Sequence, residues 1–138
     1  MSACRASGLA LLGIALGYWL TQPSARGATF SVANNGLWSD PATWTPGGGP
    51  PGSGDTANVG TAGSISPASV TLGSNHSVNT LNLGTATLDV ADFTLNAVWL
   101  NVSGPATVVG SGGIVSHSLQ VFGGTTFSID AADNVTAN

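Results

Sequence analysis

The sequence predicts an all-β protein: a parallel β-helix solenoid with coils of about 19 residues, preceded by an N-terminal signal helix. Three observations support this fold class. An uninterrupted apolar run lies close to the N-terminus, short segments alternate apolar and polar residues between turn formers, and aliphatic residues recur at a constant spacing of 19. The 138-residue chain accommodates one modest domain after processing.

The first 27 residues are predicted to be a signal peptide. Arg5 supplies a positive charge, residues 8–20 (GLALLGIALGYWL) form the apolar run, and Gln22 and Pro23 end it. A transmembrane helix needs about 20 apolar residues, so this shorter run favours a cleaved signal, and anchoring in the membrane is the alternative. The small residues of Ala25-Arg26-Gly27 place cleavage after Gly27.

The predicted cleavage site also separates the basic residues from the acidic ones. The two basic residues, Arg5 and Arg26, both lie in the signal, Lys and Glu do not occur, and the six acids are aspartates beyond position 39. Without a cation the mature chain cannot bind nucleic acid by counterion release, and anionic membrane surfaces are disfavoured for the same reason. Cys4 leaves with the signal, which excludes disulfides and cysteine metal ligands.

Residues 28–54 are predicted to form an N-terminal cap that ends in a Pro/Gly-rich loop, residues 46–54. Trp38 and Trp44 precede the first coil, and their rings are suited to cover its open end, as terminal caps do in repeat proteins. The alternative is that these two tryptophans form an aromatic platform for glycans.

Residues 55–138 are predicted to be the β-repeat segment. Alternation predicts half-buried strands that include residues 69–72, 80–83, 87–90 and 127–130. We expect the segment to be incomplete at its C-terminus, because the sequence stops at Asn138, part-way through the rung that begins near Phe127.

The repeat itself defines a predicted core ladder. Two inward positions recur every 19 residues, and they are occupied by Leu81, Leu100 and Leu119 and by Leu83, Val102 and Val121. A second set recurs more loosely at Val70, Leu88, Val108 and Phe127, and turn glycines follow the inward pairs at Gly84, Gly104 and Gly123. Stacked coils explain side chains of one type recurring in register. The alternative is an antiparallel β-sandwich, in which 19 residues make two strands and two turns.

The entry into the repeat resembles a known family. Residues 36–44 (GLWSDPATW), the Pro/Gly loop and residues 54–59 (GDTANV) resemble the opening of autotransporter-associated β-strand repeat proteins and of related exported repeat proteins with PEP-CTERM-type tails. The likeness covers roughly residues 34–128 and includes the rungs 70–73 (VTLG) and 78–84 (VNTLNLG). It implies a right-handed β-helix passenger that is secreted or lies at the cell surface or outer membrane. Within residues 1–138 we recognise neither the translocator barrel nor the C-terminal sorting signal that the resemblance leads us to expect.

We expect no catalytic activity. Eliminating lyases with this fold rely on a basic residue that the mature chain lacks, and Asp89/Asp92 and Asp130/Asp133 have the pattern of turn formers rather than of a catalytic carboxylate pair. His76 and His117 are expected at exposed turns. No cofactor is expected, although stacked Asp and Asn turns leave calcium as an alternative.

The function predicted from the sequence is therefore that of an exported structural passenger module, adhesin-like and non-enzymatic. The alternative is a carbohydrate-binding or carbohydrate-processing β-helix. Expected partners are cell-surface glycans or other repeat segments of a longer chain, with membrane contact only through export or a missing C-terminal anchor.

Overall fold

The computed structural model describes residues 27–129 and 134–137, and this part of the chain is nearly all β. The predicted signal helix lies outside the described residues. One 3-10 helix, η1 (Pro41–Thr43), accompanies the strands. These are β1 (Thr29–Val32), β2 (Gly36–Leu37), β3 (Trp44–Thr45), β4 (Thr56–Val59), β5 (Ala68–Thr71), β6 (His76–Leu83), β7 (Ala86–Ala91), β8 (Thr94–Val102), β9 (Ala106–Gly110), β10 (Gly113–Val121), β11 (Phe127–Ile129) and β12 (Asn134–Ala137).

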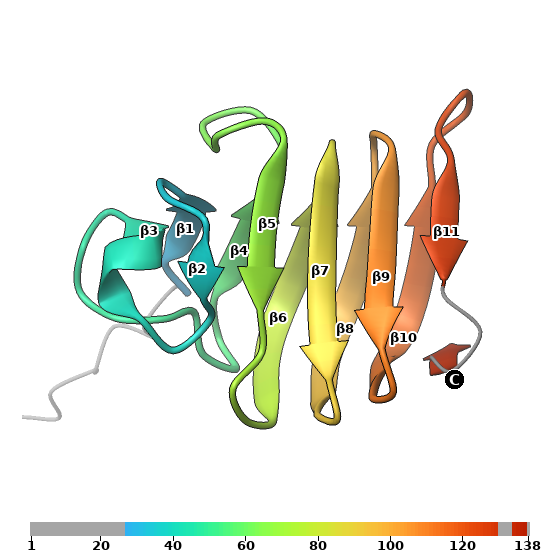
Figure 1. Ribbon diagram of the computed structural model, residues 1–138. Helices are drawn as coiled ribbons and strands as arrows, with labels where there is room; N and C mark the ends of the chain where they lie inside the picture. The colour runs from blue at the N-terminus through green and yellow to red at the C-terminus, as the bar shows by residue number, and fades with distance from the viewer. Residues whose placement is uncertain (1–26, 130–133, 138) are drawn as a thin grey trace, which may run out of the picture.

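The strands form a parallel β-solenoid, as the sequence predicts. One sheet has the order β12-β10-β8-β6-β4-β1-β3 and the other the order β11-β9-β7-β5-β2. The pairs between successive coils are parallel, and β1 with β3 makes an antiparallel pair. The antiparallel sandwich considered above is therefore wrong. In Figure 1, β5, β7, β9 and β11 run downward in front while β6, β8 and β10 run upward behind, and the chain advances from left to right, which makes the coil right-handed.

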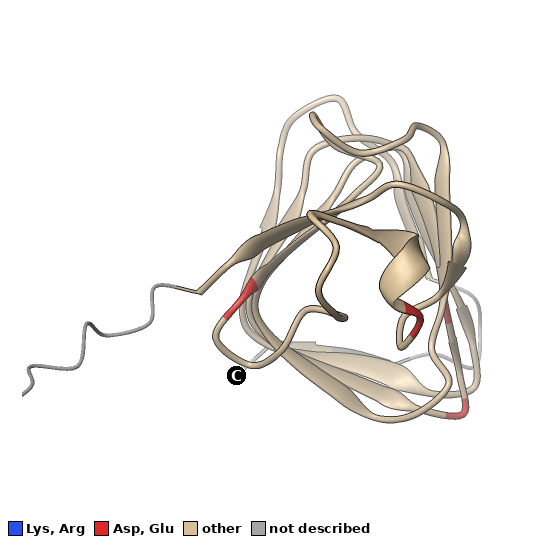
Figure 2. Ribbon diagram, turned by 90° about the vertical axis from the view of Figure 1, so that its left-hand side faces the viewer, with Lys and Arg blue, Asp and Glu red and all other residues tan. Residues whose placement is uncertain are grey.

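The long strands bend, which gives each coil a third side. Along β6 and β8 the register joins Val78 to Ala97 and then Thr80 to Trp99, so the pairing is interrupted between them. Val78 and Leu81 are both buried although they lie three residues apart, a spacing that a straight strand with a period of two does not allow. The strand therefore turns a corner at this point, and the end-on view shows a roughly triangular outline (Figure 2).

The predicted core ladder has the predicted register. Leu81 pairs with Leu100 and Leu100 with Leu119, while Leu83, Val102 and Val121 align two residues later. Leu81, Leu83, Leu100 and Val102 are completely buried.

The last rung of this ladder differs from the prediction, because Leu119 is 37% exposed and Val121 48% exposed. The strand beyond β10, β12, pairs with residues Gly113 to Ser116, and no described strand covers residues 118–121 on that side. A side chain that points into the coil is therefore buried only where another coil packs against it.

The second set of predicted inward residues has the predicted register at Val70, Leu88 and Val108, but Phe127 does not continue it. Val70 pairs with Leu88 and Leu88 with Val108, but Val108 pairs with Ile129, whereas Phe127 pairs with Ala106. Coil length varies in this sheet, so a fixed period loses register after a longer turn.

The glycine column at one corner is set by close backbone approach. A Cβ atom added at Gly84 would lie 2.0 Å from the carbonyl oxygen of Gly60, and one added at Gly104 would lie 2.8 Å from the carbonyl carbon of Gly84. Gly123, the third predicted turn glycine, has open space around its Cβ position. The column therefore runs through Gly60, Gly84 and Gly104.

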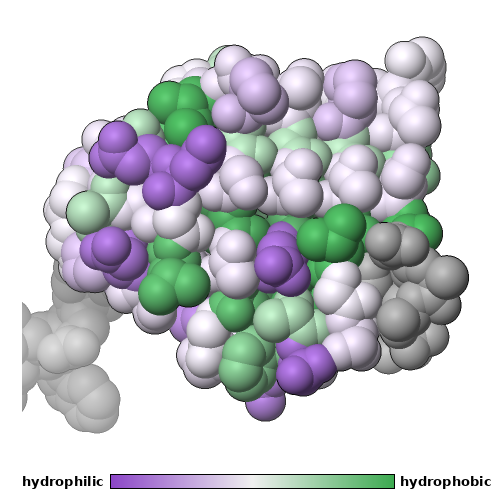
Figure 3. Space-filling view, in the orientation of Figure 1, coloured by the Kyte–Doolittle hydropathy of each residue, from purple (hydrophilic) through white to green (hydrophobic). Residues whose placement is uncertain are grey.

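The face formed by β5, β7, β9 and β11 carries a row of hydroxyl side chains. Ser69, Thr87, Thr107 and Ser128 lie in register across these strands. Figure 3 shows pale side chains of near-neutral hydropathy in rows across this face.

The ladder predicts a contrast between two leucines. Leu100→Ala should lower the free energy of unfolding by about 2–5 kcal/mol, because it leaves a cavity between two packed coils. Leu119→Ala should cost about 1 kcal/mol, because solvent already reaches that side chain. Urea denaturation of both variants measures the difference, and equal losses would contradict the stacking of Leu100 inside a continuous core.

Candidate functional site

The two tryptophans of the N-terminal segment are buried in the end of the solenoid. Trp38 is 0% and Trp44 2% exposed, and both belong to the same apolar cluster as the coil interior. Their ring centroids lie 4.8 Å apart in an edge-to-face arrangement. Figure 2 shows η1 and its neighbouring loop lying across the near end of the coil. Neither ring presents a face to solvent, and this burial favours the cap over the glycan platform for these two residues.

Hydrogen bonds hold both indoles in place. Nε1 of Trp44 donates to the carbonyl oxygen of Trp38 at 2.7 Å, and Nε1 of Trp38 donates to that of Pro51 at 3.4 Å. Asp40 caps η1 by accepting from the amide of Ala42 at 2.9 Å. The buried indole N–H groups are thus satisfied, which burial of a tryptophan requires.

Asp55 fastens this cap to the first coil. One carboxylate oxygen accepts from the amide of Ala28 at 2.7 Å and the other from the amide of Gly52 at 2.8 Å. Its carbonyl oxygen accepts from the amide of Asn79 in the next coil at 2.9 Å. An aspartate at this position therefore has a structural role.

The histidines occupy different environments. His117 is exposed at the bend of β10, whereas His76 begins β6 and is half-buried. The ring centroid of His76 lies 5.6 Å from that of Trp38, and a ring nitrogen lies 3.2 Å from the hydroxyl of Ser74. Burial lowers the pKa of His76. The expectation of an exposed turn is wrong for His76, because the buried cap supplies a ring to pack against.

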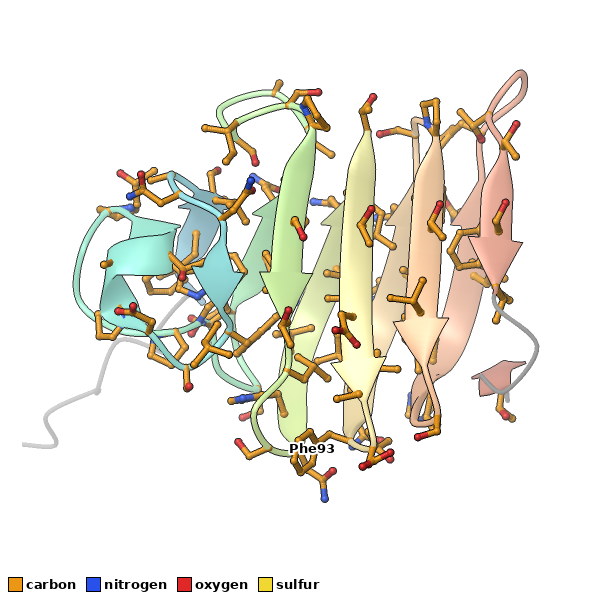
Figure 4. The ribbon with its side chains drawn as sticks, in the orientation of Figure 1. Phe93 is labelled. Carbon is orange, nitrogen blue, oxygen red and sulfur yellow. The ribbon has the colours of Figure 1, made fainter. Side chains whose placement is uncertain are left out.

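The aspartates near the turn between β7 and β8 make local hydrogen bonds. Asp89 accepts from the amide of Ala91 at 2.9 Å, and Asp92 accepts from the hydroxyl of Ser111. Phe93, labelled in Figure 4, lies in this turn and packs against the core. Its carbonyl oxygen accepts from the amide of Gly113 at 3.0 Å, which ties the turn to the next coil. The other predicted pair, Asp130/Asp133, lies outside the described residues.

Within residues 27–129 and 134–137, no group of three or more His, Cys, Asp or Glu could hold a metal ion.

A ladder of side-chain amides runs along the outside of the long strands. Nδ2 of Asn101 donates to Oδ1 of Asn82 at 2.9 Å, and Nδ2 of Asn82 donates to Oδ1 of Asn58 at 2.8 Å. Asn58 in turn donates to the hydroxyl of Ser31 at 3.2 Å, and Gln120 aligns with Asn101 at the other end. We call Asn58, Asn82, Asn101 and Gln120 the amide ladder.

Sequence reasoning missed this ladder. Asn82 and Asn101 are 19 residues apart, and each lies between two inward aliphatic residues. That sandwiched position was the available signal. Asn58 is 24 residues before Asn82, however, and so falls outside the period.

Exposed aromatic rings lie on both sides of the amide ladder. Trp99 precedes Asn101 by two residues on β8 and is 46% exposed, while Phe122 follows Gln120 by two residues and is 52% exposed. The groove on the Phe122 side is lined by the amide ladder together with Thr61, Ala62 and Ser103. This face combines aromatic surface with neutral hydrogen-bonding groups.

Comparison of the chain with protein families, with curated proteins and with solved structures found no match. In the part of the chain that the structure describes, no helix has the length and apolar character needed to cross a bilayer.

Two tryptophan variants distinguish a cap residue from a surface residue. Trp38→Ala should lower the free energy of unfolding by about 3–5 kcal/mol, because it opens a cavity where the cap meets the first coil. Trp99→Ala, the matched control on the outer face, should cost about 1 kcal/mol or less. Thermal and urea unfolding measure both, and a larger loss for Trp99→Ala would contradict the assignment of the cap.

The lowered pKa of His76 predicts that the stability of the fold depends on pH. Because its pKa is lowered from the ordinary 6.5 on folding, the unfolded chain binds more protons between the two values, and the free energy of unfolding rises with pH there. The contribution is complete above about pH 6.5 and is lost as the pH falls through the folded-state pKa. Denaturation at pH 5 and pH 7.5 should show a smaller acid loss in His76→Gln than in the wild type. His117→Gln, at the exposed bend, is the control, and an unchanged acid loss in His76→Gln would refute the prediction.

Proposed function

We propose that the chain is an exported structural module, an adhesin-like β-solenoid passenger without catalytic activity. The observation that supports it best is the single apolar cluster that extends from Trp38 and Trp44 in the cap to Ile114 in β10. A capped stack of coils with an uninterrupted interior forms a stiff scaffold that displays its outer faces.

The carboxylates favour a structural role over catalysis. Asp55 joins the cap to the coil, and Asp89 stabilises a turn by accepting a backbone hydrogen bond. Asp40 caps a helix. A catalytic carboxylate would instead face a substrate with its oxygens available.

The proposal that the module is exported rests on the sequence. The apolar run at residues 8–20 and the likeness of residues 36–59 to the opening of autotransporter-associated repeats both support a secreted or surface location. The alternative, a carbohydrate-binding or carbohydrate-processing domain, gains no support from Trp38 and Trp44, because both are buried.

Export is tested with the full chain carrying a C-terminal epitope tag in a bacterial host. The exported protein should begin at Ala28, within a few residues, when its N-terminus is sequenced. A Leu12→Asp/Leu16→Asp variant, which interrupts the apolar run, should accumulate as uncleaved precursor in the cytoplasm. Protease added to intact cells then distinguishes surface display from release. A wild-type chain that keeps Met1 and stays in the cytoplasm would overturn the proposal.

A further inference from the structure

The side chain of Trp99 is exposed, and no packing role within the fold explains its outward position. It lies on β8 between Thr80 and Ser118 of the neighbouring coils, and it alternates with the completely buried Leu100 and Val102 on the inner face. An indole that points outward from the middle of a sheet loses the packing that tryptophan normally gains. Its small hydroxyl neighbours leave the ring free to contact a ligand.

The amide ladder beside Trp99 offers an ordered row of donors and acceptors. A side-chain amide has two N–H groups and an oxygen with two lone pairs. The Asn82 amide uses one of each on its neighbours, Asn58 and Asn101, which leaves a donor and an acceptor for another partner. The ladder bonds fix each amide in direction, and neighbouring coils repeat at about 4.8 Å. The row is therefore already oriented before a ligand binds.

The groove supplies a further polar group. Among the described residues, the hydroxyl oxygen of Thr61 is buried and has no hydrogen-bond partner, and Thr61 lines the groove that contains the amide ladder. Buried polar atoms normally have a partner, and the Thr61 side chain has to turn toward the groove before a ligand group can bond to this one. Phe122 at the far side of the ladder adds a second aromatic surface.

The charge of this face indicates the class of ligand. The ladder amides, Trp99, Phe122 and the groove residues are all uncharged, and Lys and Arg do not occur anywhere in the described part of the chain (Figure 2). An acidic polymer would find no cation here, and a cationic one no carboxylate. A sugar chain without charge presents hydroxyl groups to amides and the apolar C–H face of its ring to an aromatic side chain.

We propose that this face binds a neutral polysaccharide, with the ring of Trp99 stacking on a sugar and the amide ladder hydrogen-bonding to its hydroxyls. The site is independent of the export proposal, because it depends only on the folded coils. Its polymer would lie across the outer face of β4, β6, β8 and β10, along the amide ladder.

The purified full chain is tested by affinity electrophoresis in gels that contain soluble β-glucan, mannan, xylan, galactan or polygalacturonate. At least one neutral polymer should retard the wild type. Trp99→Ala should weaken that retardation at least fivefold, and Trp99→Phe should restore part of it. Asn101→Leu should weaken it as well. Leu37→Ala changes an exposed apolar residue on β2, in the other sheet, and is the matched control that should bind as the wild type does.

Thermal unfolding of each variant separates loss of the site from loss of the fold. A second readout does not depend on any variant: a bound polymer should protect the exposed Trp99, but not the buried Trp38 and Trp44, from quenching by acrylamide. The proposal is overturned if no neutral polymer retards the protein, if folded Trp99→Ala binds as the wild type does, or if retardation occurs only with polygalacturonate.

Discussion

The stacking of one coil on the next is the constraint on which the whole structure depends. Parallel strands lie about 4.8 Å apart, so an inward side chain must pack directly on its counterpart in the next coil. Leu81 on Leu100 satisfies this inside the coil, and at the corner the glycine column allows the backbones to approach closely. Because strands have a period of two, a slip of one residue would turn every aliphatic side chain outward. Variation in coil length is therefore found in the turns and at the end of β7, where the register shifts between Asp89 and Ala91.

The two ends of the stack show what this constraint requires. At the N-terminal end, the paired indoles of Trp38 and Trp44 fill the space that a preceding coil would fill, and Asp55 fastens the covering segment. At the other end of the described coils, Leu119 and Val121 have the same register as the buried residues beneath them but are partly exposed. The same kind of side chain thus belongs to the core or to the surface according to what lies against it.

Residues inside the coils stabilise the fold, whereas residues on the outer faces are available for recognition. The interior is aliphatic and closely stacked, so substitutions there act on stability. The outer faces bear hydroxyls on one sheet and amides with aromatic rings on the other, and their identity is free of the stacking requirement. Even so, Asn58, Asn82 and Asn101 extend the stacking to the surface by bonding to one another across coils. A recognition surface built in this way is held rigid by the fold beneath it.

Alternation and the spacing of 19 predicted from sequence alone a parallel solenoid in which Leu81 and Leu100 share the interior, because both signals come from the strands themselves. The same spacing left an antiparallel sandwich open, and the parallel strand pairing of the structure excludes it. Only the tertiary structure decided three other features: the partial exposure of Leu119, the pairing of Val108 with Ile129, and the packing of His76 beside Trp38. Each depends on turn lengths or on a segment distant in sequence. The tryptophans illustrate the same limit. Trp38, Trp44 and Trp99 are chemically identical, but the cap buries two of them and an outward strand position exposes the third. Local sequence determines which way a side chain points relative to its strand, whereas burial depends on which coil or cap packs against it.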